Sequence, residues 1–525
     1  MGRGSVFLGV RTGATSSSKG GVVRKYKTFI AAAIFSCSVG RAGDTSAADY
    51  SVSWETTGRL EAFTTYDDPT GKIGVLLADG PVITKNHPFF RPTGPSNRSC
   101  ATCHVPENAM GLSTDRIKAG WKEFADKDPV FASVDGSNCP NLAQNDESSH
   151  SLLLNRGVFR ISLPWPPRDP QGKPIQPEFD IQVVRDPTGC NTNPTFGLNS
   201  KDPHISVYRR PRVVANLKYI LNFPNQFGPG FNVKTGFAQP TAPDGQGVYS
   251  MNLMADSRFL TLRDQHTGAI KDHIPGAPKL SNTDMDKILG FTQQVYAAQV
   301  EDKSGGNLIE PGGPLGLGPY NLMKADIGYN GESIATPTFQ HFDQWQGKAG
   351  VPPASSSAQF RESVARGANL FIAKVFLIRD VYGITHLGLG NPVKRSCALC
   401  HNAQMTGQDL APGWMDIGTG NWPSASNKFD LPQFKLTCRQ DAAPHPYLGR
   451  VIYTTDPGRA LVTGLCTDIG AIVIGQLRGL AARAPYFSNG SAETLRAVVD
   501  FYDRRFQIGY TEQEKQDMVN FLGVL

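Results

Sequence analysis

Long hydrophobic runs, dense positive charge and cysteine are all scarce in this chain, and each scarcity excludes something. Beyond residue 42, no segment reaches ~18 uninterrupted apolar residues, so we expect no transmembrane span in the mature form. Only 19% of the 525 residues are charged, the formal net charge is +6, and no Lys/Arg tract stands out. This pattern argues against a nucleic-acid partner. A mildly basic surface would instead suit docking of a small acidic redox protein.

The N-terminal region has the composition of an export signal. The basic stretch "VVRKYK" (22–27) precedes the short apolar run "TFIAAAIFSCSVG" (28–40), which is too short to span a membrane. We therefore predict a signal peptide over 1–42 and a periplasmic protein. The polar residues ahead of the basic stretch leave open a start downstream of Met1. Lipid anchoring at Cys37 is not expected, because a bulky residue stands two positions before it.

Cysteine occurs nine times. In an oxidising compartment, the four cysteines that lie outside the signal and outside the motifs below would form disulfides. Proximity in the sequence favours the pairs Cys139–Cys190 and Cys438–Cys466. Three pairings are possible, and free buried thiols are the alternative.

The remaining four cysteines belong to two copies of one motif, Cys-x-x-Cys-His. The copies are Cys100–Cys103–His104 and Cys397–Cys400–His401. Two thiols at this spacing can add to the vinyl groups of one haem, and the imidazole that follows then ligates the iron. A zinc site would need further Cys or His at short spacing, and a thioredoxin-like site would need a βαβ context; neither surrounds these motifs. We predict two covalently bound haem c groups, with His104 and His401 as iron ligands.

Helical patterns surround the second motif. Apolar residues recur at helical spacing over 359–372, 492–506 and 511–525. Ser491 and Thr511 are the expected N-caps of the last two helices.

The two motifs lie far apart, so each can have its own domain. Gly (55) and Pro (38) are abundant, which predicts long loops. We expect a mainly α protein made of two cytochrome c-type haem domains with long loop-rich insertions. The N-terminal haem c domain, with its insert, is placed at 50–345 and the C-terminal one at 358–525, joined by a linker over 351–357.

The C-terminal region resembles a known family. "TDPGRALVTG", "LRGLAARAPYFSNGSAETLRAVVDFY" and "EKQDMVNFL" are similar to the bacterial di-haem cytochrome c peroxidase superfamily, which includes MauG. The resemblance covers 359–525. Around 87–104 and 151–164 the chain looks like a large, uncharacterised branch of cytochrome c domain-containing proteins. The resemblance implies two facing helical haem domains, with peroxide chemistry at one haem and electron relay at the other. It also implies a calcium site, whose ligands have no recognisable counterpart here.

The resemblance bears on the ligand of the C-terminal haem. Peroxidases supply a Met fourteen residues after the His of "PYFHDG"; here Ser488 stands at the His position and Tyr502 at the Met position. MauG-like members also have Tyr there. A phenolate would stabilise ferric or higher-valent iron. The alternative is a Tyr packed on the haem face with its hydroxyl bonded elsewhere.

The N-terminal haem is expected to be the reactive one. Residues 105–149 contain no His, and Met110 is more naturally a packed residue than a ligand. His104 would then hold a five-coordinate iron, open to hydrogen peroxide or oxygen. A hidden ligand would close it, and the candidates are Met251, Met254 and His150.

A loop between the haems supplies the family's acid and donor. "LRDQHTGAIKDHIPG" (262–276) resembles that loop: Gln265 matches its Gln, but its Glu falls near Pro275. His273 is our candidate for the missing acid/base, because an imidazole titrates near neutrality. The alternative is a surface or structural His.

Two further positions follow from the resemblance. The family's bridging Trp is replaced near Asn225, and Tyr219, Phe223 or Phe227 are candidate relays. Arg478, in "QLRGL", matches a family Arg that could pair with a haem propionate.

Three functions remain open at this point. The first is a peroxidase/MauG-like haem oxidoreductase. The second is a di-haem electron-transfer cytochrome without catalytic activity. The third is a di-haem oxygenase of the rubber-oxygenase type, which a deep apolar channel to the first haem would favour.

Overall fold

A computed structural model describes residues 57–221, 250, 252–324, 341–387, 390–401, 407, 413–423 and 428–525. These residues belong to one compact unit, Val52–Leu525. The predicted signal peptide (1–42) lies outside the described residues. The domain bounds 50–345 and 358–525 stay a prediction.

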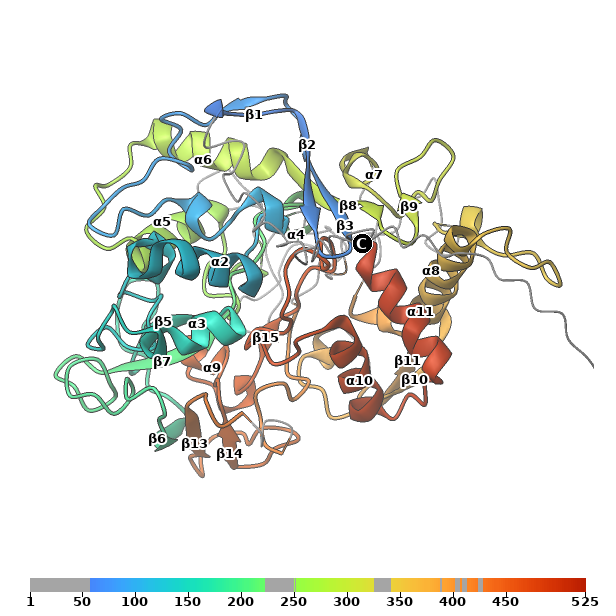
Figure 1. Cartoon of the computed structure of the whole chain (residues 1–525). Coiled ribbons are helices and arrows are strands. Elements are labelled where there is room, and N and C mark those ends of the chain that lie inside the picture. Colours follow the sequence, from blue (N-terminus) through green and yellow to red (C-terminus); the bar gives the residue numbers. More distant parts are fainter. Residues whose placement is uncertain are drawn as a thin grey trace, which may run out of the picture. The chain divides into compact units, whose positions relative to one another are not determined.

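The described part contains both helices and strands (Figure 1). Its α-helices are α2 (Thr114–Phe124), α3 (Ser151–Arg156), α4 (Lys218–Leu221), α5 (Leu262–His273), α6 (Asn282–Gln294), α7 (Pro319–Lys324), α8 (Ser356–Ala373), α9 (Ala460–Thr463), α10 (Leu495–Phe506) and α11 (Glu512–Gly523). Its strands are β1 (Arg59–Leu60), β2 (Phe63–Asp68), β3 (Gly71–Leu77), β4 (Val82–Ile83), β5 (Phe159–Pro164), β6 (Phe179–Arg185), β7 (His204–Arg209), β8 (Val295–Asp302), β9 (Gly306–Asn307), β10 (Phe376–Ile378), β11 (Val393–Arg395), β12 (Trp414–Met415), β13 (Gln433–Cys438), β14 (Val451–Thr454) and β15 (Ile472–Val473).

The prediction of a mainly α fold is wrong. The strands form a four-stranded sheet (β2-β3-β8-β9), a three-stranded sheet (β14-β13-β6) and several strand pairs, all antiparallel. The alternation that builds them is present in the sequence: β13 alternates partly exposed and buried residues along its whole length. The family resemblance implied helical haem domains, whereas this period of two indicates strands.

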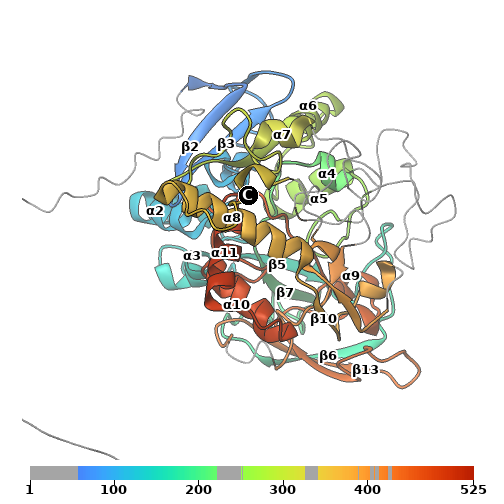
Figure 2. The ribbon, with the colours of Figure 1, turned by 90° about the vertical axis from the view of Figure 1, so that its right-hand side faces the viewer.

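The three helices predicted near the second motif are confirmed. Helix α8 contains 359–372, and α11 begins after Thr511, whose hydroxyl accepts a hydrogen bond from the Glu514 amide. The cap of α10 is Thr494 rather than Ser491, because Thr494 Oγ1 accepts from the Ala497 amide. Helices α8 and α11 lie side by side in both views, with α10 next to α11 (Figure 2).

One sheet joins distant parts of the chain. Strand β13 pairs with β6, so that Leu436 lies opposite Ile181, and β14 pairs with the other edge of β13. Side chains of β6, β13 and β7 pack in one hydrophobic core, to which β13 contributes Phe434 and β7 contributes Val207. A strand that precedes the linker region is therefore held by strands that follow it.

Both predicted disulfides are confirmed. Cys139 pairs with Cys190 across 5.2 Å between Cα atoms, and Cys438 pairs with Cys466 across 5.9 Å. The second bridge ties the end of β13 to the segment after α9.

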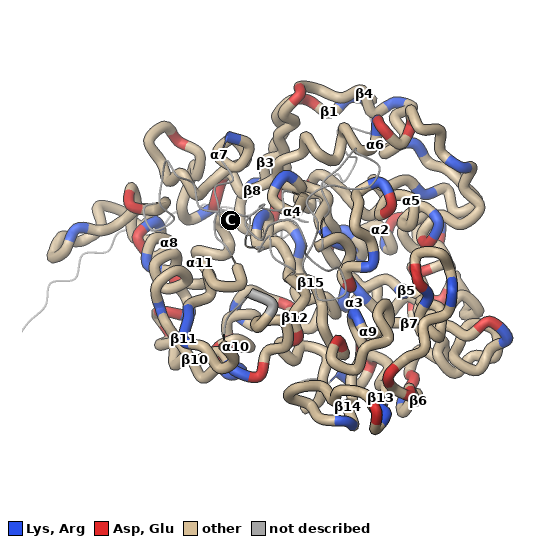
Figure 3. Tube along the Cα trace, turned by 180° about the vertical axis from the view of Figure 1, so that it is seen from behind, with Lys and Arg blue, Asp and Glu red and all other residues tan. Residues whose placement is uncertain are grey.

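Charges of both signs are interspersed along the trace (Figure 3). Within the described ranges, no helix is long and apolar enough to cross a membrane.

Candidate functional site

The two Cys-x-x-Cys-His motifs fold in the same way. In each, the first cysteine begins a short 3-10 turn, Cys100–Thr102 in one and Cys397–Leu399 in the other, and the second cysteine follows as its C-cap. The His amide then donates to the carbonyl of the first Cys, at 3.1 Å for His104 and 3.0 Å for His401. The four motif cysteines take no part in the two disulfides. One turn thus presents two thiols and an imidazole together, as haem attachment requires.

Each motif histidine is also oriented by its neighbourhood. His104 Nδ1 lies 3.3 Å from the carbonyl oxygen of Met110, and His401 Nδ1 lies 2.8 Å from that of Gly407. A carbonyl can only accept, so Nδ1 donates and Nε2 keeps its lone pair. Such a bond to the other ring nitrogen is how proteins orient metal-binding imidazoles. The acceptor stands six residues after the histidine in both motifs.

Burial keeps these groups uncharged. It lowers the pKa of His104 to about 4 and lowers the pKa of His401 as well. It raises the pKa of the Cys100 and Cys103 thiols to about 12. A neutral imidazole is the form that binds iron, whereas thiols of such high pKa are poor redox nucleophiles at neutral pH.

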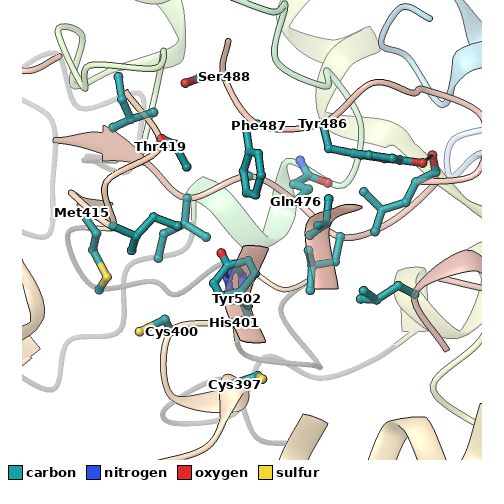
Figure 4. A pocket seen from close by; sticks show the side chains of 18 of the residues that line it. Cys397, Cys400, His401, Met415, Thr419, Gln476, Tyr486, Phe487, Ser488 and Tyr502 are labelled. Carbon is teal, nitrogen blue, oxygen red and sulfur yellow. Dashed lines mark hydrogen bonds between the residues drawn. The ribbon is translucent and has the colours of Figure 1, made fainter. Parts of the chain in front are cut away.

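A cavity of about 270 Å³ lies beside the second motif. Helix α10 turns one face toward it, since Val499, Tyr502 and Phe506 recur at helical spacing. In Figure 4, Tyr502 and His401 lie together at the centre of the cavity. The Tyr502 hydroxyl is 3.3 Å from His401 Nε2, and burial raises the pKa of this phenol. The neutral hydroxyl therefore donates to the nitrogen that would bind iron.

The opposite wall of this cavity comes from the segment before α10. Figure 4 shows Tyr486, Phe487 and Ser488 across from the two motif cysteines. Ser488, at the position where the family has His, is thus part of the lining. Apolar side chains complete the wall, and they include Phe371, Met415, Leu480 and Leu495.

A smaller cavity, of about 150 Å³, lies beside the first motif. Helix α5 faces it with Leu262, Gln265, His266, Ala269 and His273, which share one face of the helix. Cys103, His104 and Asp135 line it as well. The structure therefore brings the two predicted catalytic residues, Gln265 and His273, to the cavity beside His104.

His273 is held by a buried carboxylate. Its Nδ1 lies 2.6 Å from Asp135 Oδ2, and Asp135 also forms an ion pair with the buried Arg98. Burial alone would raise the pKa of Asp135, but Arg98 and His273 outweigh it and lower the pKa. Because Nδ1 donates to this carboxylate, Nε2 of His273 is left as the nitrogen that can exchange a proton.

Gln265 is oriented from both sides. Its Oε1 accepts from His266 Nδ1 at 2.6 Å, and its Nε2 donates to Met254 Sδ at 3.3 Å. Burial lowers the pKa of His266 to about 4, so this ring is neutral. The amide is therefore fixed, with its NH₂ end toward the sulfur of Met254.

Other predicted residues lie away from these cavities. Met110 packs in the core, although its carbonyl orients His104. Both ring nitrogens of the buried His150 lie against carbonyl oxygens. The Tyr219 hydroxyl donates to the Leu322 carbonyl. Arg478 donates to the Gly316 carbonyl and is absent from the linings of both cavities in the described part.

Some predicted positions cannot be placed. Phe223, Asn225, Phe227 and Met251 lie outside the described residues. Within the described ranges, no three His, Cys, Asp or Glu side chains converge as they would around a metal ion, so the calcium site gains no candidate ligands.

Sequence reasoning missed Asp135 and a group of arginines, Arg210, Arg212 and Arg483. Asp135 meets a partner 138 residues away, for which the sequence holds no signal. The arginines carried a weak signal, because each is a charged residue within an otherwise apolar or proline-containing stretch.

The residues at both motifs fit a covalent haem. Cysteines outside any disulfide, an imidazole oriented through Nδ1 and an adjacent cavity occur together at each one. Cys100, Cys103 and His104 would hold one haem, and Cys397, Cys400 and His401 the other.

Comparisons with known proteins give partial similarity. No protein-family model matches this chain. Over 147 residues it is 29% identical to cytochrome-c peroxidase IdrP1 of Pseudomonas sp. (strain SCT), a match that covers 25% of this chain and 37% of that protein. The chain thus spans little more than a third of the length of this curated relative. The similarity supports the peroxidase superfamily but not a particular branch of it.

Two solved structures align over more of the chain. One is the hydrazine synthase of Kuenenia stuttgartiensis, with a TM-score of 0.28 and 12% identity over 61% of this chain and 73% of that one. The other is a MauG-like protein associated with microbial copper homeostasis, with a TM-score of 0.26 and 16% identity over 60% of this chain and 92% of that one.

Proposed function

We propose that this chain is an exported di-haem c-type oxidoreductase that reduces hydrogen peroxide, or reacts with oxygen, at the haem attached through Cys100 and Cys103 and ligated by His104. The single observation that carries the proposal is the cavity beside His104, where Gln265 and the His273–Asp135 pair face the iron-binding imidazole. The partial similarity to a peroxidase supports the same reaction class.

The reaction requires electrons, protons and an open iron. Reduction of one peroxide to two waters consumes two electrons and two protons, and a small redox protein would supply the electrons. A bound haem with an open iron supplies the peroxide-binding and electron-accepting chemistry. This chain's residues handle the proton: His273 Nε2 takes it up and returns it while Asp135 holds Nδ1 in place. Gln265 orients the substrate by donating from its fixed amide.

The cavity beside His401 suits electron relay better than substrate binding. The Tyr502 hydroxyl lies beside His401 Nε2, so two protein groups would be available to the iron and none would be left for a substrate. We propose that His401 and Tyr502 would together hold the iron of this haem, which would supply electron relay to the other site.

A di-haem electron carrier is the second candidate, and one observation favours it. Met254 lines the cavity beside His104, and its thioether is a common ligand of cytochrome iron. Its sulfur accepts a hydrogen bond from Gln265, which holds it inside the cavity. If this sulfur moved to the iron, the open position would be lost.

Low-temperature EPR of the oxidised protein with both haems attached separates the two functions. The proposed enzyme should give a high-spin ferric signal that cyanide abolishes. Low-spin signals alone, in both the fully oxidised and the half-reduced protein, would contradict it and favour the carrier. A Met254→Ala variant is the matched check, because only a carrier would gain high-spin signal from it.

A further inference from the structure

Three arginines line the region where the two cavities meet. The segment from Arg210 to Val213 contributes to the walls of both cavities. Arg483 contributes to the wall of the cavity beside His401. Positive charge is therefore concentrated at the boundary between the two proposed haem sites.

Among the described residues, the guanidinium groups of these arginines donate hydrogen bonds to backbone carbonyl oxygens and to no side chain. Arg210 donates to the carbonyls of Leu112 and Arg483, at 2.5 and 2.9 Å. Arg212 donates to two successive carbonyls in the β15 region, at 2.8 and 2.5 Å. Arg483 donates to the carbonyl of Gln476. Within the described ranges, no carboxylate forms an ion pair with any of the three.

The preceding residue provides an internal comparison. Arg209 is buried as well, but it forms ion pairs with Asp256 and Asp456. Burial opposes its charge, yet the two carboxylates outweigh burial and raise its pKa. Among the described residues, Arg209 is thus paired with two carboxylates, whereas Arg210 and Arg212 form no ion pair; the more distant charge of Asp256 raises the pKa of Arg212 but does not outweigh burial.

The pKa values of the three guanidinium groups show that burial disfavours their charge. Burial lowers the pKa of Arg210 to about 9 and those of Arg212 and Arg483 to about 10. The charge of Arg483 lowers the pKa of Arg210 and of Arg212 further. Buried cations normally have anionic partners, and among the described residues no carboxylate forms an ion pair with these three, so they are suited to bind an added anion.

We infer that Arg210, Arg212 and Arg483 bind the propionate carboxylates of the two haems, and that Arg210 and Arg212 contact both haems. The inference rests on the proposed function, because it requires both haems to be attached. Guanidinium forks suit carboxylates by shape and charge, and the arginines lie in the walls of the very cavities that adjoin the haem-attachment motifs. One short segment would then couple the electrostatics of both irons, in place of a bridging aromatic residue.

Redox titration of the full chain tests this inference. Mass spectrometry first establishes that two haems are attached, and EPR-monitored titration then follows each haem separately. A nearby positive charge favours the ferrous form. Arg212→Gln should therefore lower the midpoint potentials of both haems, by about 59 mV for each tenfold change in a one-electron equilibrium. Arg483→Gln should lower only that of the haem at His401.

Matched variants separate charge from structure. Arg212→Lys and Arg483→Lys keep the charge and should leave the potentials near those of the wild type. Arg168→Gln removes an exposed positive charge on the loop after β5 and should change neither. Equal shifts in the Lys and Gln variants, or no shift in any variant, would overturn the inference.

Two outcomes distinguish other failures. Benzoate serves as a probe for a substrate carboxylate: a saturable change in the wild-type potentials on adding it would overturn the assignment to propionates. If mass spectrometry finds no attached haem, the proposed function fails and this inference fails with it. If both haems are attached and the Gln variants behave as wild type, only this inference fails.

Discussion

Tyr502 is the residue on which the character of the second haem depends. Its hydroxyl lies 3.3 Å from His401 Nε2, and its buried phenol is neutral without iron. A ferric iron nearby would favour the phenolate, because opposite charges lower the pKa of an acid. Ligation by an anionic oxygen then stabilises ferric iron.

Replacing Tyr502 should therefore raise the midpoint potential of the haem at His401. We expect Tyr502→Phe to change its reduction equilibrium at least tenfold, which is about 59 mV for one electron. Potentiometric titration with EPR detection measures this shift. Tyr486→Phe is the matched control, because its hydroxyl lies in the same cavity wall but donates to the Leu480 carbonyl. Similar potentials in Tyr502→Phe and wild type would mean that the phenol is not a ligand.

His273 carries the second prediction at this scale. His273→Gln should slow peroxide reduction by roughly 10²–10⁴-fold, the usual contribution of a general acid/base. The melting temperature should change little, since the side chain is 32% exposed. Steady-state rates of peroxide reduction by the wild type and the variant provide the check. His204→Gln, at the half-buried start of β7 and outside both cavity linings, should retain full activity.

Asp135 gives a contrasting result in the same assay. Asp135→Asn should lose activity and stability together, because Arg98 would be left buried without its carboxylate. Breaking a buried ion pair costs roughly 3–5 kcal/mol. Full activity in His273→Gln would return His273 to the structural role that the sequence left open.

At the scale of residues, local patterns were predictable and long-range contacts were not. The two haem motifs follow from spacing alone, and Tyr502 followed from counting along a family motif. The role of Asp135 could not be predicted, because it depends on a hydrogen bond to His273 on a helix far along the chain. Arg483 gains its meaning only from a cavity wall that folding assembles.

At the scale of elements, the packing of α8 against α11 depends on a glycine. A Cβ atom added at Gly367 would lie 2.1 Å from the carbonyl oxygen of Asp517, which is too close for any relaxed side chain. Asp517 also accepts hydrogen bonds from Ser363 and Arg366 on α8, so moving the two helices apart would break these hydrogen bonds. The close approach positions Phe371, which lines the cavity beside His401.

Gly367→Ala should destabilise the protein by about 1–3 kcal/mol, the range for inserting a methyl group into a packed interface. Thermal or urea unfolding measures the change. Gly290→Ala on α6 is the matched control, because nothing lies within 4 Å of its added Cβ. That substitution should stabilise its helix by about 0.5–1 kcal/mol. Equal stability of the two variants would show that α8 and α11 are free to adjust.

Helices were easier to predict here than strands. The periodicity around 359–372 and 511–525 is long and strong, and Thr511 has the cap signature that a sequence can show. The strands are short, and many pair with segments far away, as β13 does with β6. The alternation of apolar and polar residues in the strands is visible in the sequence, but pairing partners at such separation cannot be identified from periodicity alone.

At the scale of the whole molecule, the cysteines account for both chemistry and stability. Nine are present, and Cys37 lies in the predicted signal. Four of the others form the two disulfides, and four are thiols in the haem motifs. Each disulfide closes a loop, of 51 and 28 residues. Chain-entropy arguments give each a stabilisation of about 4 kcal/mol.

Thiol labelling of the denatured mature protein tests this division in one experiment. If both haems are attached by thioethers and both disulfides form, an alkylating reagent should label no cysteine without reduction. After reduction, only Cys139, Cys190, Cys438 and Cys466 should be labelled, because a thioether resists reductants. Peptide mass spectrometry locates the labels and the haem-bearing peptides.

A paired variant makes the same experiment specific for one haem. Cys397→Ser with Cys400→Ser should reduce the mass by one haem and leave the disulfide labelling unchanged, because the disulfides lie outside the motif. Labels at Cys100 and Cys103 in the unreduced wild type would contradict covalent attachment at the first motif and remove the reactive haem from the proposed mechanism. Labels at Cys438 and Cys466 without reduction would instead contradict this disulfide and leave the haem sites as proposed.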